Sequence, residues 1–79
     1  MTVTIRLSTT LRGYVTDYSP SSGLEMKLED RLTVAELAKK LGLPCNEIKI
    51  VMVNGRHASL EQTLSDGDRI GFFPAVGGG

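Results

Sequence analysis

One short segment, residues 33 to 42, carries the apolar spacing of a helix, and its single apolar stripe limits what the rest of the chain can build. Thr33 and Glu36 have the spacing of a capping box, so a helix is predicted to begin at Thr33. Apolar residues then follow at helical spacing, namely Val34, Leu37, Ala38 and Leu41. Gly42 is placed to end the helix in a left-handed conformation. Such a helix needs one apolar surface to pack against, and the remaining segments must supply it.

Short β-strands are predicted before this helix. Residues 3 to 7 and 24 to 28 alternate apolar and polar side chains, which is the pattern of two half-buried strands that pair antiparallel. Between them, residues 8 to 23 contain few apolar side chains and a Ser-Pro-Ser-Ser-Gly segment. We therefore expect a long loop here, with room for a short turn around residues 11 to 15.

The strands predicted after the helix complete the sheet. Residues 48 to 53 are almost continuously apolar and β-branched, so we expect a strand that is covered on at least part of both faces. Asn54-Gly55 favours a tight turn into a short strand at residues 56 to 58. The turn signal of residues 65 to 68 then precedes a final strand at residues 69 to 73.

This order of elements predicts an α+β domain of the β-grasp (ubiquitin-like) kind. Two strands, one main helix and further strands that return beside the first pair can bury the apolar face of the helix against one mixed sheet of four to five strands. A length of 79 residues and a hydrophobic content of 41% suffice for one such domain. We place the domain at residues 1–73 and a flexible tail at residues 74–79.

Charge and composition exclude several classes of function. Nine basic and nine acidic residues give a formal net charge of zero, without a long run of either sign, so nucleic-acid binding and membrane binding are not expected. The longest apolar run, residues 50 to 53, is far too short to cross a bilayer, and no signal peptide follows Met1. The single cysteine, Cys45, cannot form an internal disulfide, which suits a reducing compartment. We expect a cytoplasmic protein.

No set of side chains predicts catalysis or metal binding. His57 follows a turn without a predictable acid or nucleophile beside it, so we interpret it as an exposed strand residue. Cys45 is interpreted as a buried or half-buried inert thiol. Asp66 and Asp68 are typical of turn chemistry, because no third oxygen donor is evident near them. We therefore expect no catalytic residue, no metal site and no bound cofactor.

The tail at residues 74 to 79 carries the strongest functional signal. It follows the last predicted strand directly and ends in Gly77-Gly78-Gly79. One interpretation is a frayed end or a glycine-rich linker left by engineering. The other is functional: glycines lack a Cβ, so Gly77 and Gly78 can thread a narrow channel in a partner and present the carboxylate of Gly79 to its active site. Pro74 shortens the freely rotating part by fixing its own φ.

Strand alternation predicts the contacts beside the tail. Ile70 and Phe72 face one side of the last strand, and Phe73 faces the other. Phe73 is therefore either an exposed aromatic anchor at the root of the tail or a second core ring, and the sequence leaves both open. Val76, with Pro74, is a candidate for further contact with a docked partner.

The end of the chain resembles that of a known family. Residues 64 to 79 contain the ending Phe73-Pro74-x-Val76-x-Gly78-Gly79, which closely resembles the MoaD/ThiS family of ubiquitin-like sulfur carriers, most of all the small subunit of molybdopterin synthase. The order of predicted elements agrees over the whole chain. The first loop, residues 8 to 22, lacks the clear helical stretch that we associate with those small subunits.

The resemblance implies a carrier that is a substrate of other enzymes. A ubiquitin-activating-type adenylating enzyme would use ATP to convert the Gly79 carboxylate into an acyl-adenylate, and a sulfur donor would replace the adenylate and leave a thiocarboxylate. A larger synthase subunit would then accept the tail and use the sulfur to build the dithiolene that holds molybdenum or tungsten.

Three alternatives stay open. The sulfur could instead supply thiamin thiazole synthesis or another metabolite. The activated Gly79 could join a lysine of a target protein, as ubiquitin-like modifiers do. Finally, the domain could be a β-grasp interaction module whose glycine tail is inert.

Overall fold

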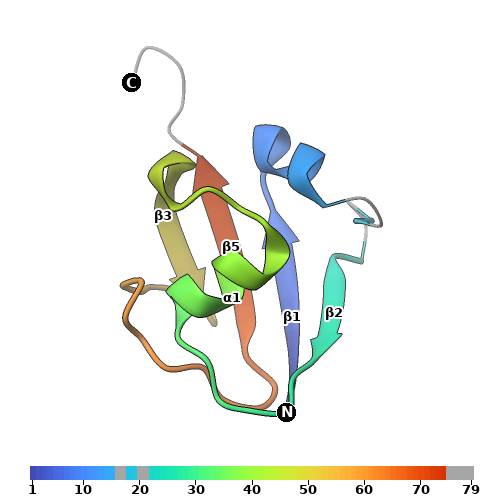
Figure 1. The fold of residues 1–79 in the computed structure, drawn as a ribbon, viewed down its shortest axis with the longest axis vertical. Helices are drawn as coiled ribbons and strands as arrows, with labels where there is room; N and C mark the ends of the chain where they lie inside the picture. Colours follow the sequence, from blue (N-terminus) through green and yellow to red (C-terminus); the bar gives the residue numbers. More distant parts are fainter. Residues whose placement is uncertain (16–17, 20–21, 75–79) are drawn as a thin grey trace.

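The computed structural model describes residues 1–15, 18–19 and 22–74, which form one five-stranded sheet with an α-helix packed against it (Figure 1). The elements in chain order are β1 (Thr2–Leu7), the 3₁₀ helix η1 (Thr9–Tyr14), β2 (Leu24–Lys27), α1 (Val34–Leu41), the 3₁₀ helix η2 (Cys45–Glu47), β3 (Ile48–Val53), β4 (Arg56–His57) and β5 (Arg69–Pro74). The strands lie in the order β2-β1-β5-β3-β4. β1 and β5 are parallel and the other neighbouring pairs are antiparallel, so the sheet is mixed. The predicted β-grasp fold is confirmed.

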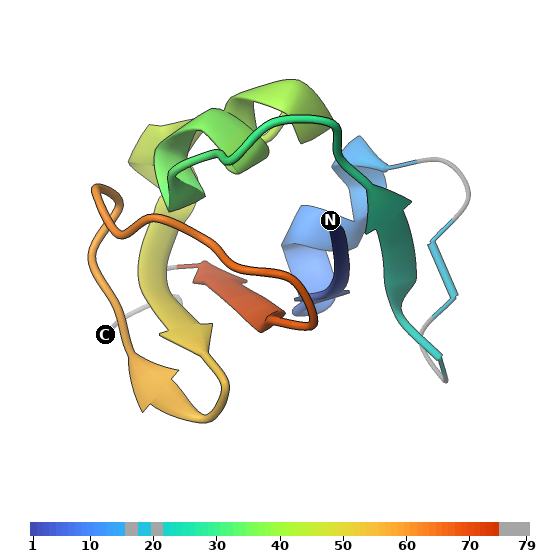
Figure 2. The same ribbon diagram turned by 90° about the horizontal axis from the view of Figure 1, so that it is seen from below.

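α1 forms where the sequence predicts it and covers one face of the sheet (Figure 2). The Thr33 hydroxyl accepts a hydrogen bond from the Glu36 N–H at 3.2 Å, and the Glu36 carboxylate accepts one from the Thr33 N–H at 2.9 Å. Gly42 ends the helix with a φ of 79°. The core consists of the buried side chains of Val3, Ile5, Leu7, Leu11, Leu28, Val34, Leu37, Ala38, Leu43, Val51, Val53, Leu64, Ile70 and Phe72. The sheet face turned away from α1 is named the open face below.

The segment after β1 is more regular than the sequence predicts. Instead of a long loop with a short turn, the chain forms η1 over six residues, Thr9–Tyr14. Leu11 accounts for this difference, because its side chain is fully buried and its N–H donates to the Ser8 carbonyl at 2.9 Å. A single buried apolar residue forms no periodic pattern, so the sequence did not predict this 3₁₀ helix. A helical stretch does follow β1, contrary to the expectation for residues 8 to 22.

β3 is buried on its helix side and partly covered on the open face, in agreement with the prediction that at least part of both faces is covered. Val51 and Val53 are buried on the helix side, whereas Ile50 on the open face keeps 41% of its surface exposed. A single helix can bury only one face of a sheet. A register shift between Ile48 and Ile50 lets Ile48 pack against the core as well. β5 runs one residue further than predicted, to Pro74, which pairs with Ile48.

Candidate functional site at the root of the tail

β5 brings the root of the tail to the middle of one end of the sheet. This strand lies between β1 and β3 and pairs with both. η1 and η2 lie at the same end of the molecule (Figure 1). The domain therefore holds the chain on both sides up to Phe72, and on the β3 side up to Pro74. The predicted site residues Val76, Gly77, Gly78 and Gly79 lie outside the described residues.

The two adjacent phenylalanines of β5 point to opposite faces of the sheet. Phe72 is fully buried in the core, whereas 39% of Phe73 is exposed on the open face. Of the two positions that the sequence left open for Phe73, the structure has the exposed one. The Phe73 ring lies back over Gly71. A Cβ placed on Gly71 would come within 3.1 Å of the ring atom Cε2. Gly71 thus leaves room for the ring to rest on the strand.

An apolar cluster surrounds Phe73. Ile50, Met52 and Phe73 share the open face, and we name them the open-face patch. Ile50 is the cross-strand partner of Phe73, and Met52 lies opposite Gly71. Sequence reasoning found Phe73 and missed the other two. The signal was present, because both alternate with Val51, which turns into the core.

At the end of β1, side chains form hydrogen bonds with the backbone of Leu7 on the side beyond its pairing with β2. Within residues 1–15, 18–19 and 22–74, β2 pairs with β1 only from Thr2 to Ile5, so no described strand lies beside the backbone of Leu7 on that side. The Leu7 N–H donates to the Tyr18 hydroxyl, and the Leu7 carbonyl accepts from Nε of Arg12, both at 2.9 Å. The guanidinium of Arg12 lies 5.8 Å from the centre of the Tyr18 ring. These contacts fix Arg12 and Tyr18 beside Phe73, and all three line a hollow of about 200 Å³.

A second contact links the two 3₁₀ helices at this end. The Tyr14 hydroxyl donates a hydrogen bond to the Glu47 carboxylate, 33 residues further along the chain. This hydrogen bond is the main reason that the pKa of Tyr14 is raised above its ordinary value of 10.0, and desolvation and the charge of Glu47 act in the same direction. Tyr14, Ile50 and Phe73 are the exposed large hydrophobic residues of the described chain, at 45%, 41% and 39%. All three belong to the end of the sheet from which the tail leaves.

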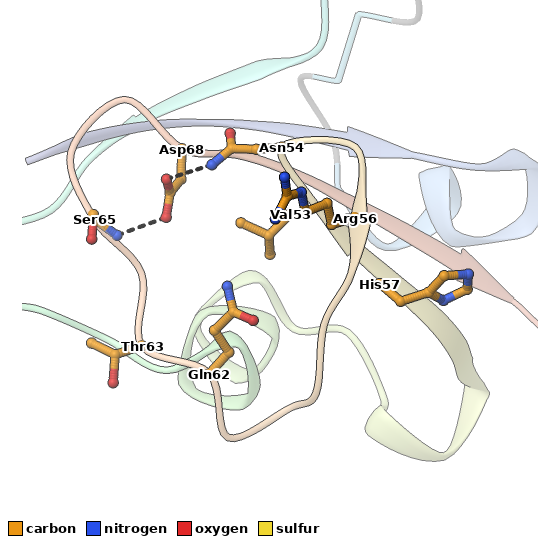
Figure 3. Close-up of a pocket in the computed structure, with 8 residues that line it drawn as sticks. All are labelled: Val53, Asn54, Arg56, His57, Gln62, Thr63, Ser65 and Asp68. Atoms are coloured by element: carbon orange, nitrogen blue, oxygen red, sulfur yellow. Dashed lines mark hydrogen bonds between the residues drawn. The ribbon is translucent and has the colours of Figure 1, made fainter.

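A larger hollow of about 640 Å³ lies at the opposite end of β5 (Figure 3). One wall is a turn network in which the Asp68 carboxylate accepts from Nδ2 of Asn54 at 2.9 Å and from the N–H of Ser65 at 2.7 Å. Asp66 accepts from a backbone N–H of β1 at 2.7 Å. Both aspartates therefore serve turns, as predicted, and the positive φ of Asn54 confirms the hairpin turn. His57 is exposed in β4, as predicted.

Other classes of site are not represented in the described residues. Residues 1–15, 18–19 and 22–74 contain no group of three or more His, Cys, Asp or Glu side chains placed to hold a metal ion. Within the same ranges no helix has the length and apolar character needed to cross a membrane. Cys45 begins η2, and the burial of its thiol stays a prediction. The predicted site residues that the structure describes, Phe73 and Pro74, meet at the root of the tail.

A β-grasp domain whose central strand ends at an exposed aromatic residue and continues into a glycine-rich tail has the architecture of ubiquitin-like proteins. Residues 13–79 match the model of the ThiS family, so the chain belongs to this family of small ubiquitin-like sulfur carriers. A comparison with curated proteins gave no significant match.

Solved structures of similar fold include proteins from three organisms. SAMP1 from Haloferax volcanii superposes with a TM-score of 0.69 at 21% identity, over 100% of both chains. A candidate molybdopterin converting factor, subunit 1, from Pyrococcus furiosus gives 0.69 at 20% identity, over 96% of this chain and 99% of that one. A thiamine biosynthesis protein from Geobacter metallireducens gives 0.58 at 24% identity, over 100% of this chain and 88% of that one. At these identities the likeness shows the fold alone.

Proposed function

We propose that this protein carries sulfur as a thiocarboxylate on Gly79 and donates it in molybdopterin synthesis, for a molybdenum or tungsten cofactor. The observation that carries the proposal is the position of Phe73 and Pro74. They end the central strand and lead directly into the residues that end in Gly78-Gly79, and Phe73 is itself part of the open-face patch. Membership of the ThiS family supports the carrier role. The Phe73-Pro74-x-Val76 ending supports the molybdopterin pathway.

In this function the protein supplies an acyl group, and other proteins supply the catalysis. On a ubiquitin-activating-type enzyme in the cytoplasm, a carboxylate oxygen of Gly79 attacks the α-phosphorus of ATP and displaces pyrophosphate, which gives an acyl-adenylate. A hydrosulfide equivalent from a sulfur donor then attacks the acyl carbon. The bond to AMP breaks, AMP leaves, and loss of a proton gives the thiocarboxylate. Activation is needed because a carboxylate accepts a nucleophile only after one of its oxygens has become part of a good leaving group.

The open-face patch is the part of the domain that we assign to docking. A glycine tail that becomes ordered in a partner loses conformational entropy worth about 1–2 kcal/mol per residue. The exposed parts of Ile50 and Phe73, 41% and 39% of their surfaces, amount to roughly 150 Å². At ~25 cal/mol per Å², burying them contributes about 4 kcal/mol. This gain offsets the ordering of two or three tail residues, so Phe73 and Ile50 together make docking of the tail feasible.

Thiamin thiazole synthesis is the second candidate pathway for the sulfur. The match to the ThiS family model and the fold shared with the Geobacter metallireducens thiamine biosynthesis protein favour it. The carrier chemistry up to the thiocarboxylate is the same in both pathways. The two candidates differ only in the acceptor that receives the sulfur.

A transfer assay separates the two pathways. The thiocarboxylated protein is divided between the larger subunit of molybdopterin synthase with its pterin precursor and a thiazole synthase with its substrates, all from the same organism. We expect dithiolene product in the first reaction and none in the second, and a carrier that lacks Gly78 and Gly79 serves as the matched control. Product in the thiazole reaction alone would contradict the molybdopterin assignment.

A further inference from the structure

β2 is an edge strand whose outer backbone groups have no partner among the described residues. The strand order places β1 on one side of β2 and no described strand on the other (Figure 1). The Met1 ammonium donates to the Leu28 carbonyl at 2.6 Å, and the Leu28 N–H donates to the Met1 carbonyl at 2.7 Å. Hydrogen-bonded positions alternate along an antiparallel pair, so the N–H and C=O groups of Glu25 and Lys27 point away from β1. These groups form the outer edge of the sheet.

The chain itself limits how much of this edge is available. Just before β2, the outward N–H of Gly23 donates to the Ser19 carbonyl at 2.7 Å, and the two residues form an isolated antiparallel bridge. After Lys27 the chain leaves the strand and bends at Glu29. The free part of the edge is therefore confined to Glu25 and Lys27, which restricts the registers in which another strand could pair there.

The two edge residues carry opposite charges on the same face of the sheet. Both side chains are exposed, and their cross-strand neighbours on β1 are the uncharged Thr4 and Thr2. Neither Glu25 nor Lys27 forms an ion pair with another described residue. Charged side chains on an edge strand usually oppose pairing with another strand. Here the two signs alternate, so they oppose pairing in some registers and favour it in one.

We propose that two copies of the chain pair through β2 as antiparallel strands about a two-fold axis, with Met26 opposite the partner's Met26. In this register Glu25 lies opposite the partner's Lys27, and Lys27 lies opposite the partner's Glu25. Each of these pairs exchanges both of its backbone hydrogen bonds and joins opposite charges. The neighbouring registers place Glu25 opposite Glu25, or Lys27 opposite Lys27, and like charges directly opposite repel. Charge complementarity therefore selects a second copy as the occupant of the edge, and one register for it.

This pairing leaves the candidate site free. β1 separates β2 from β5, so Phe73 and the root of the tail take no part in the contact. Because the paired β2 strands are antiparallel, the two tails leave at opposite ends of the joined sheet. The dimer is weak, since only short edge strands meet and stable interfaces generally bury more than ~1,000 Å². The proposal goes beyond the carrier function and does not depend on it.

Sedimentation equilibrium of the full chain, at concentrations up to about 1 mM, measures the association. Glu25→Lys and Lys27→Glu each place like charges in both cross-strand pairs, so each should raise the dissociation constant of the dimer about 10-fold. The double variant, with the two charges exchanged, should associate like the wild type. An equimolar mixture of the two single variants should do the same, because each basic strand then meets an acidic one. Glu61→Lys is the matched control: it is exposed away from the edge and changes the net charge as Glu25→Lys does.

Amide hydrogen exchange tests the backbone geometry in the same samples. The N–H groups of Glu25 and Lys27 should become more protected as the protein concentration rises, because they then donate to the partner's strand. The N–H groups of Leu24 and Met26 face β1 within one copy, so their protection should not change.

Several results would overturn the dimer. A protein that stays monomeric at about 1 mM would do so, as would an association that Glu61→Lys weakens as much as Glu25→Lys does. Protection of the edge amides only when another protein is added would show that a second copy is the wrong occupant. Asp17, Glu29 and Asp30 keep their charges in every variant, so the comparison isolates the two paired positions. Failure of Gly79 to become adenylated would leave these results unchanged and would count against the proposed function alone.

Discussion

Replacing Phe72 and Phe73 by alanine, one at a time, should produce very different losses of stability. Phe72 is fully buried, so its removal leaves a cavity and should cost about 3–5 kcal/mol. That is a large part of the ~4–12 kcal/mol expected for a domain of this length. About three fifths of Phe73 is buried, and its site opens to solvent, so no cavity remains after truncation. Full burial of a phenylalanine is worth ~1.5–3 kcal/mol, which puts the cost for Phe73 at about 1–2 kcal/mol.

Urea unfolding followed by far-UV circular dichroism suits this comparison, because the chain has no tryptophan to report by fluorescence. With a slope of about 1 kcal/mol per molar urea, Phe73→Ala should lower the midpoint by about 1–2 M. Phe72→Ala should lower the midpoint by about 3–5 M, and Phe72→Leu, a milder change, keeps the comparison measurable where that loss unfolds the alanine variant without urea. Equal losses for the two alanine variants, or a larger loss for Phe73, would refute the assignment of the rings to opposite faces.

Gly23→Ala should destabilise the domain by about 2 kcal/mol, because Gly23 has a φ of +77° and a Cβ there would lie 2.8 Å from a backbone carbonyl of β1; an unchanged urea midpoint would argue against this. Gly71→Ala should weaken binding to the adenylating enzyme by displacing the Phe73 ring, while stability changes by less than about 1 kcal/mol. A loss of stability with normal binding would mean that Gly71 serves the fold and not the position of Phe73 for binding. The raised pKa of Tyr14 means that its hydrogen bond stabilises the fold below the unfolded pKa of 10.0, and that this stabilisation is lost as the pH rises through the folded value. The stability difference between the wild type and Tyr14→Phe should therefore be constant from neutral pH to about 10, fall as the pH rises further, and vanish once the pH exceeds the raised folded pKa. In Glu47→Gln the tyrosinate absorbance should titrate closer to 10.0.

The sequence predicted those parts of the fold that local interactions decide. The capping box of Thr33 and Glu36 and the left-handed Gly42 act within one helix, so their spacing alone locates α1. Strand alternation located the core residues and predicted that the side chains of Phe72 and Phe73 point to opposite faces of the sheet. Turn residues such as Asn54 located the hairpin for the same local reason.

Features that depend on distant parts of the chain escaped prediction. η1 exists because one side chain, Leu11, fills a place in a core built mostly by other segments. The end of β1 is completed by Tyr18, whose hydroxyl accepts from Leu7 across 11 residues of sequence. Alternation in the sequence separates Ile50 from Val51, but which of the two α1 covers depends on how the helix and the strands assemble. The hollow beside Phe73 depends on the placement of η1 and of Tyr18, because Arg12 and Tyr18 both line it.

The central claim is that the carboxylate of Gly79 becomes a thiocarboxylate, and intact mass spectrometry tests it most directly. The protein is incubated with ATP, a sulfide source and the ubiquitin-activating-type enzyme of the same organism. We predict a mass gain equal to the exchange of one oxygen for one sulfur, which disappears when Gly79 is deleted. No gain from the full chain, under conditions in which the same enzyme activates another carrier, would contradict the account.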